Sequence, residues 1–297
     1  MSPNPRSQSE LTSFGYGFLG VLIFSLTLPA TRIAVTGFDP VFVGLGRAIV
    51  AAGLSLILLV ITRQTIPPLR FLPNFAIVTA GVVVGFPLLS AIAMKDAAAS
   101  HGAVITGLLP LSTALCGAWR AGERPLRGFW LFASLGSALV LIFALVTGGG
   151  SLRMADLALL GAVGSAALGY AEGAVLSRTF GSWQVICWAL ILSVPVLLPI
   201  VWQHLPANFS LISVNAVLAF LYVSVFSMFL GFFAWYRGLA LGGIARIGQL
   251  QLIQPFMTIA SSAILLGERL SIETIGFAIA VIGCVLLGKR TQIAAKS

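Results

Sequence analysis

Ten runs of about 20 apolar residues, joined by short loops, constrain this sequence more than any other feature. A helix rises about 1.5 Å per residue, so each run matches the hydrocarbon thickness of a bilayer. With 59% hydrophobic and 8% charged residues, the chain cannot cover itself with a polar surface. The runs are continuously apolar rather than alternating, which predicts helices and argues against a β-barrel. Their predicted bounds are 13–35, 41–62, 72–94, 99–119, 128–147, 156–177, 183–203, 213–236, 244–266 and 271–288.

The basic residues predict the orientation of these helices. Of the 17 Lys and Arg residues, twelve fall in segments on the side of the N-terminus and three on the other side. The remaining two, Arg32 and Arg47, lie within runs. Basic residues in short loops mark the cytoplasmic side, so we expect a multi-pass inner-membrane protein with both termini in the cytoplasm. The net charge of +9 then reports orientation, and we expect no nucleic-acid partner because the charges are spread between loops.

One short pattern occurs twice at a fixed offset. Pro110 precedes Gly122-Glu123-Arg124 by twelve residues, and Pro255 precedes Gly267-Glu268-Arg269 by the same spacing. The offset is 255 − 110 = 145 residues, or about half of the chain. A second copy of a five-helix unit must enter the membrane the other way up. The prediction is an all-α polytopic membrane protein of ten transmembrane helices, in two inverted five-helix repeats at 1–147 and 148–297.

These motifs resemble the drug/metabolite transporter superfamily, EamA type, over essentially the whole chain. In that family each repeat ends with Pro, a span, Leu-Gly-Glu and a glycine-rich helix. The second half follows this pattern, and the first half departs slightly with Ala121-Gly122-Glu123. The resemblance implies a secondary transporter that works by alternating access, and within the family it points to amino-acid export. The matching residues in the second half are Pro255, Leu266, Gly267, Glu268, Gly276 and Gly283.

Polar side chains on the two proline-containing helices are candidates for substrate binding. At about 100° per residue, Gln251, Gln254 and Thr258 share one face, and Thr106 and Thr113 form the milder equivalent in the first half. An amide that faced lipid would be costly, so these faces look at protein or water. Amides and hydroxyls suit a zwitterion, because they can donate to a carboxylate and accept from an ammonium. The alternative is that they only bond neighbouring helices.

Aromatic residues offer a second set of candidates. Tyr170 lies in the middle of its helix and is predicted to face the pocket, and Ser90 is included because the 145-residue offset aligns it with Trp235. Trp235 and Tyr236 precede Arg237 at the predicted inner edge, which favours an interfacial belt over a pocket wall.

Prolines and charges within the spans are the remaining candidates. Proline removes a backbone hydrogen bond from a helix, so Pro87, Pro110 and Pro255 are predicted hinges, although proline is also common in membrane helices. Glu172 either carries a coupling proton or neutralises an Arg of a neighbouring helix. Arg47 is the one basic residue at mid-depth, where an anionic substrate would need it.

Other function classes find less support. Paired carboxylates and metal-ligand clusters are missing from the sequence, so we expect no enzyme, cofactor or metal. The cysteines lie in different spans, which is typical of apolar packing residues. We expect export of small metabolites, most of all amino acids, by a monomer in the lipid bilayer, with a dimer as the alternative. Drugs or quaternary cations and phosphorylated metabolites remain alternative substrates, and a membrane scaffold or membrane enzyme is less favoured.

Overall fold

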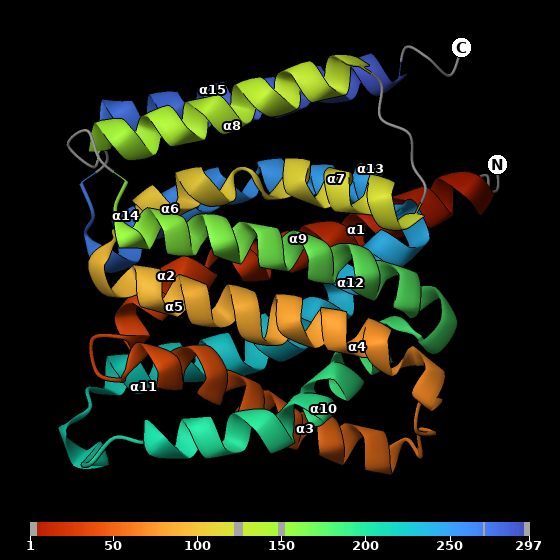
Figure 1. Ribbon diagram of the computed structural model, residues 1–297, viewed down its shortest axis with the longest axis vertical. Coiled ribbons are helices and arrows are strands. Elements are labelled where there is room, and N and C mark those ends of the chain that lie inside the picture. The colour runs from red at the N-terminus through yellow and green to blue at the C-terminus, as the bar shows by residue number, and fades with distance from the viewer. Residues whose placement is uncertain (1–4, 122–126, 148–151, 270, 294–297) are drawn as a thin grey trace.

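A computed structural model describes residues 5–121, 127–147, 152–269 and 271–293. The residues it describes form helices and connecting loops, with no strand among them (Figure 1). The α-helices are α1 (Pro5–Ser25), α2 (Thr27–Ala34), α3 (Arg47–Ile61), α4 (Leu72–Val78), α5 (Phe86–Asp96), α6 (Ala99–Thr106), α7 (Leu109–Ala121), α8 (Arg127–Thr147), α9 (Met154–Phe180), α10 (Ser182–Gln203), α11 (Val214–Leu221), α12 (Gly231–Gly242), α13 (Ile244–Gly248), α14 (Gln254–Leu266) and α15 (Ile272–Ile293). Wider π-helical segments are η1 (Phe42–Gly46), η3 (Thr79–Gly85) and η5 (Tyr222–Leu230), and 3-10 turns are η2 (Leu69–Phe71), η4 (Phe209–Leu211) and η6 (Gln249–Leu252).

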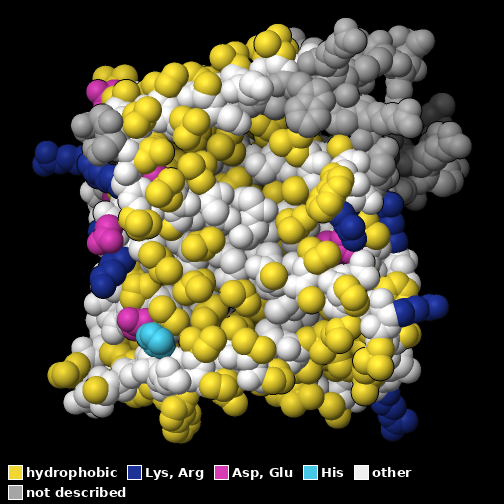
Figure 2. All heavy atoms as spheres, viewed as in Figure 1, with side chains coloured by type: hydrophobic (Ala, Val, Ile, Leu, Met, Phe, Trp, Pro, Cys, Tyr) yellow, Lys and Arg dark blue, Asp and Glu magenta, His cyan; other side chains and the backbone are white. Residues whose placement is uncertain are grey.

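These elements join into membrane spans. Eight helical stretches are long and apolar enough to cross a bilayer, and two shorter apolar stretches, Ser134–Thr147 and Ile272–Cys284, lie in α8 and α15. The ten stretches agree with the ten predicted runs. Figure 2 shows the consequence on one face, where charged side chains gather toward the two ends and hydrophobic side chains cover the band between them. All-α architecture in a membrane is therefore the observed fold class.

The two halves share their helix boundaries at the predicted offset. Adding 145 to the first residues of α6, α7 and α8 (99, 109 and 127) gives 244, 254 and 272, which are the first residues of α13, α14 and α15. Figure 1 shows that the second copy of each runs in the opposite direction to the first. The inverted repeat is therefore visible in the positions of the helix breaks, in addition to the Pro and Gly-Glu-Arg pattern.

The second Gly-Glu-Arg motif ends one helix and caps another. Gly267 has a φ of +64°, a left-handed conformation that suits glycine, and it ends α14. The carboxylate of Glu268 accepts hydrogen bonds from the backbone N–H groups of Ala99 (2.8 Å) and Ser100 (2.9 Å) at the start of α6. The motif thus ties the end of one repeat to a broken helix of the other. Its first copy, Gly122-Glu123-Arg124, and the glycine linker 148–151 lie outside the described residues.

Helix α9 lies in the middle of the molecule, and α8 and α15 pair along one edge (Figure 1). Residues Ala166, Tyr170 and Glu172 of α9 are buried. Gly81 and Gly169 let the third span approach α9 closely, because a Cβ on Gly81 would lie 2.5 Å from the carbonyl oxygen of Ser165. This central packing positions the pocket described next.

Candidate functional site

A small pocket lies between the two halves. The residues that line it come from the inner parts of several spans, away from their ends. Its volume is about 10 Å³, which is room for about one water molecule. Small-molecule sites usually enclose about 300–1,000 Å³, so the conformation is closed around a pocket that must widen to accept a ligand. Its apolar wall consists of Phe24, Val82, Phe86, Ala166 and Phe232, and its polar wall of Thr27, Arg47, Tyr170, Ser227 and Gln254.

Three π-helical segments adjoin this pocket. Arg47 directly follows η1, Val82 lies within η3, and Ser227 lies within η5. The offset relates the last two segments, since 79 + 145 = 224 and 85 + 145 = 230 both fall within η5. A π-helical turn inserts an extra residue and often marks a functional site. Here the wider turns direct side chains from three spans into one place.

Arg47 is the most unusual residue of the pocket. Its side chain is 2% exposed, and its Nε and Nη1 atoms are buried without a hydrogen-bond partner among the described residues. The ion pairs found in the described part of the chain are His101–Asp156 and Arg120–Glu172, so neither involves Arg47. Burying an unpaired charge costs several kcal/mol, in the range of about 3–5 kcal/mol when one partner of a pair is missing. An anion bound in the pocket would remove that penalty.

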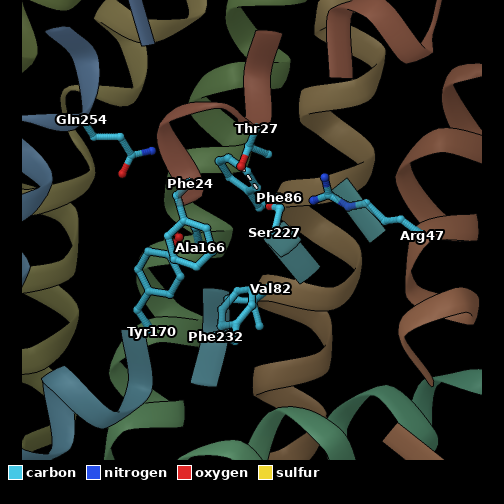
Figure 3. Close-up of a pocket in the computed structure, with 10 residues that line it drawn as sticks. All are labelled: Phe24, Thr27, Arg47, Val82, Phe86, Ala166, Tyr170, Ser227, Phe232 and Gln254. Atoms are coloured by element: carbon cyan, nitrogen blue, oxygen red, sulfur yellow. Dashed lines mark hydrogen bonds between the residues drawn. The ribbon is translucent and has the colours of Figure 1, made fainter. Parts of the chain in front are cut away.

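Hydrogen-bond acceptors lie across the pocket from Arg47. Figure 3 shows Gln254 and Arg47 entering from opposite sides. The Oε1 atom of Gln254 is buried without a partner in the described part of the chain. Burying such a group without a partner costs about 1–3 kcal/mol, so this amide oxygen is available to a ligand in the pocket. Both amide atoms of Gln251, one turn earlier, also lack partners among the described residues, but Gln251 does not line the pocket.

Aromatic rings in mutual contact form one wall of the pocket. The ring centroid of Tyr170 lies 6.4 Å from that of Phe24, on which it stacks, 6.1 Å from that of Phe232 and 5.5 Å from that of Trp235, which meets it edge-on. Trp235 and Tyr236 are 0% exposed, so the prediction of an interfacial belt was wrong for both. The reason is that α12 continues to Gly242, beyond the predicted end at 236. At about 1.5 Å per residue, this places Trp235 about 10 Å inside the helix end.

The predicted substrate-binding residues do not all meet at the pocket. Gln254 and Tyr170 line it. Thr258 instead donates to the carbonyl oxygen of Ser25 (2.8 Å), which joins α14 to α1. Ser90 and Thr106 donate to Pro87 (3.2 Å) and Ala103 (3.1 Å) within their own helices. Gln251 and Thr113 are buried, and neither lines the pocket.

The predicted hinge prolines lie at helix discontinuities. Pro87 follows η3 in the first turn of α5. Pro110 is the second residue of α7, after the two-residue break that ends α6, and Pro255 is the second residue of α14, after η6. The two later breaks meet, because a side chain at Gly107 would contact the ring of Pro255 at 3.6 Å. Their placement suits a hinge, and hinge motion itself stays a prediction.

Comparison with known proteins identifies the chain. The model of the EamA-like transporter family matches residues 12–147 and again 153–289. The chain belongs to the EamA-like transporter family. It is 50% identical over 274 residues to the uncharacterized transporter YdeK of Bacillus subtilis (strain 168), which covers 92% of this chain and 96% of YdeK. One crystal structure of a protein matches the fold with a TM-score of 0.68 at 15% identity, over 93% of this chain and 98% of that chain.

Membership of this family gives the general function of the protein. It is a multi-pass membrane transporter of the inner membrane, as the family, the bacterial relative and the apolar helices together show. An enzymatic activity is not what this family indicates. The likeness to the crystal structure shows the fold alone, at 15% identity.

Glu172 lies in a network at the end of the transporter where α1 begins. Its Oε2 atom accepts from Nε of Arg120 (2.6 Å) and its Oε1 atom accepts from Nδ2 of Asn74 (2.5 Å). Glu172 is 0% exposed. The three residues come from α9, α7 and α4, so the network joins the two halves. The arrangement favours the neutralising role for Glu172 over the coupling role.

A different set of polar contacts joins the helices at the opposite end of the transporter. Nη1 of Arg32 donates to the carbonyl oxygens of Met94 and Lys95, both at 2.5 Å. His101 and Asp156 form a pair with Nε2 and Oδ1 2.5 Å apart. Arg32 thus joins α2 to α5, the His101–Asp156 pair joins α6 to α9, and Glu268 joins the end of α14 to α6.

Several pocket residues escaped sequence reasoning. Phe24, Thr27, Phe232 and Ser227 are ordinary membrane-helix residues, and only the fold brings them together. Thr27 and Ser227 form a hydrogen bond of 2.9 Å between the two halves, drawn in Figure 3. Arg47 gave a signal, since it is a charged residue inside a span, but the signal did not reveal its missing partner.

Proposed function

We propose that this transporter exports amino acids and that the pocket beside Arg47 binds them as zwitterions. The observation that carries the proposal is the buried guanidinium without a partner in the described structure. A carboxylate is a good match because Nε and Nη1 are donors of a charged group that lack partners among the described residues, and a bond from either to a carboxylate is charge-assisted. Charge-assisted pairs of this kind are shorter and stronger than neutral hydrogen bonds.

The other side of the pocket suits an ammonium group. The Oε1 atom of Gln254 is a free acceptor, and Tyr170 and Phe24 offer aromatic faces. A cation above an aromatic face gains about 0.5–2 kcal/mol, depending on how far water is excluded. The pocket thus separates a cationic binding group from neutral acceptors, which is the arrangement a zwitterion needs.

A quaternary cation fits this pocket less well. It would bring a second positive charge near Arg47, and no carboxylate lines the pocket. An organic anion without an ammonium group is the second candidate, because Arg47 favours it as much as it favours an amino acid. The free amide oxygen of Gln254 supports the zwitterion, since an anion without a donor group would leave that acceptor unpaired.

Competition for uptake into proteoliposomes tests the proposal. The purified transporter is given one labelled neutral amino acid, with four unlabelled competitors that differ by single groups. The competitors are the same amino acid, its deaminated acid, its decarboxylated amine and tetramethylammonium. We expect the amino acid to compete at least about a hundredfold better than the amine, which lacks the carboxylate.

The outcomes separate the candidates. If the deaminated acid competes as well as the amino acid, the second candidate is correct and amino-acid export is wrong. If the amine or tetramethylammonium competes best, both candidates are wrong. Loading the vesicles and measuring efflux then tests whether the same compounds move outward. The proposed mechanism is alternating access about the broken helices at Pro110 and Pro255.

A further inference from the structure

A second groove lies on the outside of the transporter, away from the central pocket. Its volume is about 710 Å³, and it runs between α1, the start of α10, η5 and α12. Leu19, Phe226 and Leu230 line it and are 46%, 46% and 38% exposed. In a membrane, exposed apolar side chains of this kind face the acyl chains of lipids. The groove is therefore open to lipid along its apolar length.

One end of the groove is polar and suited to an anion. Helix α10 begins there. Its N-cap residue is Gly181, which has no side chain that could accept a hydrogen bond from the first N–H groups of the helix. The first N–H groups of a helix have no partner within the helix and attract anions. A second observation supports a ligand at this point. Ser182 is 5% exposed, its Oγ atom has no partner among the described residues, and it lines the groove.

Charge at the same end completes the site. Arg237 lines the groove, is exposed, and forms no ion pair with a described carboxylate. Gln184 also lines the groove, and its Oε1 atom is a buried acceptor without a partner in the described part of the chain. Trp183 and Tyr16 lie beside them, and Trp and Tyr are enriched where lipid headgroups meet the hydrocarbon.

We propose that this groove binds one anionic phospholipid of the phosphatidylglycerol type. Ser182, the first N–H groups of α10 and Arg237 bind the phosphate, and a headgroup hydroxyl donates to Gln184. The acyl chains lie against Leu19, Phe226 and Leu230. A zwitterionic lipid fits less well, because its cationic headgroup would lie near Arg237 without a carboxylate to balance it. The predicted orientation places Arg237 at the cytoplasmic leaflet, whose anionic lipids attract basic residues.

Native mass spectrometry of the full-length transporter tests this proposal. The protein is purified in mild detergent and mixed with phosphatidylglycerol, phosphatidylethanolamine or phosphatidylcholine with identical acyl chains. We expect one tightly retained phosphatidylglycerol, and weaker retention of the other two lipids. Arg237→Gln and Ser182→Ala should each lower its retention about tenfold, the effect of about 1.4 kcal/mol. Arg70→Gln, at an exposed arginine of the same end that does not line the groove, is the matched control.

Three results would overturn the proposal. One is equal retention of phosphatidylglycerol and phosphatidylethanolamine. Another is normal lipid retention by both groove variants, which thermal unfolding must show to be folded. The third is a lipid-free dimer that cross-links through this groove, because the groove would then be an interface between copies. The amino-acid proposal is unaffected by any of these results, since the groove and the pocket share no lining residue.

Discussion

Replacing Arg47 by glutamine should weaken substrate binding and stabilise the empty transporter. Hydrogen bonds to charged groups contribute about 1.5–3 kcal/mol each. With Nε and Nη1 both free to donate, we take the loss as about 3 kcal/mol, or on the order of a hundredfold in affinity. The empty protein, however, loses a buried charge without a partner. Because a buried glutamine would still lack a partner, we expect only part of that penalty, about 2 kcal/mol, to be removed, which should raise the Tm by several degrees at roughly 2–4 °C for each kcal/mol.

Arg120→Gln is the matched control, because the same substitution removes a paired arginine. Glu172 is 0% exposed and would remain buried with its charge uncompensated. Breaking a buried pair costs about 3–5 kcal/mol, and we expect about 2–3 kcal/mol because Arg120 is 30% exposed. The Tm of this variant should therefore fall.

Two measurements on the purified variants decide the matter. Thermal unfolding without substrate gives the sign of each stability change, and uptake into proteoliposomes gives the KM. A lower Tm for Arg47→Gln together with an unchanged KM would refute the reasoning, since Arg47 would then be a structural residue. Arg47→Lys keeps the charge but replaces the planar set of donors with a single ammonium group, so its affinity should fall between those of the wild type and Arg47→Gln.

Three further predictions concern the predicted coupling residue, the hinges and the central packing. Glu172→Gln should lower stability yet leave any response of uptake to an imposed pH gradient unchanged; loss of that response would instead assign proton coupling to Glu172. Pro255→Ala should change the transport rate more than the amount of folded protein, and an unaltered rate would exclude a hinge at this position. Gly81→Ala should destabilise by about 1–3 kcal/mol, because its Cβ would lie 2.5 Å from a carbonyl oxygen, whereas Gly164→Ala has open space and should be tolerated; equal unfolding temperatures would contradict this packing argument.

The spans were predictable because lipid imposes a simple rule on sequence. A backbone in hydrocarbon must bond itself, so each span needs about 20 apolar residues, and the runs show directly in the sequence. The repeat was predictable because Pro110 and Pro255 lie at one offset from their Gly-Glu-Arg motifs. The same offset relates the helix starts at Leu109 and Gln254. Local signals therefore specified where helices begin and break.

The pocket was only partly predictable because it depends on contacts between distant segments. Tyr170 and Gln254 were identified from their depth and polarity, and both line the pocket. The polar character of Thr258 gave no indication that its hydroxyl would bond Ser25, more than 200 residues away in sequence. The π-helical segments also escaped notice, since no residue type marks an extra residue in a turn. For Trp235, a predicted helix end six residues too early led to the wrong environment.

The interaction energies at the pocket and at the two ends of the transporter are of similar size. Substrate binding in the pocket can therefore affect whether an end is open or closed. One end is held by Glu172 with Arg120 and Asn74, and the other by Arg32 and Glu268. Breaking the Arg120–Glu172 pair costs about 2–3 kcal/mol, exposed contacts contribute about 0–1 kcal/mol each and a helix cap about 1 kcal/mol, so each end is closed by a few kcal/mol. The conformation described here also buries the charge of Arg47 without a partner among the described residues. A ligand shifts a conformational equilibrium only by its difference in affinity for the two states. A carboxylate that pairs with Arg47 when the pocket closes supplies about 3 kcal/mol of such a difference, which is enough to decide whether an end stays shut. One residue can thus select the substrate and favour its enclosure.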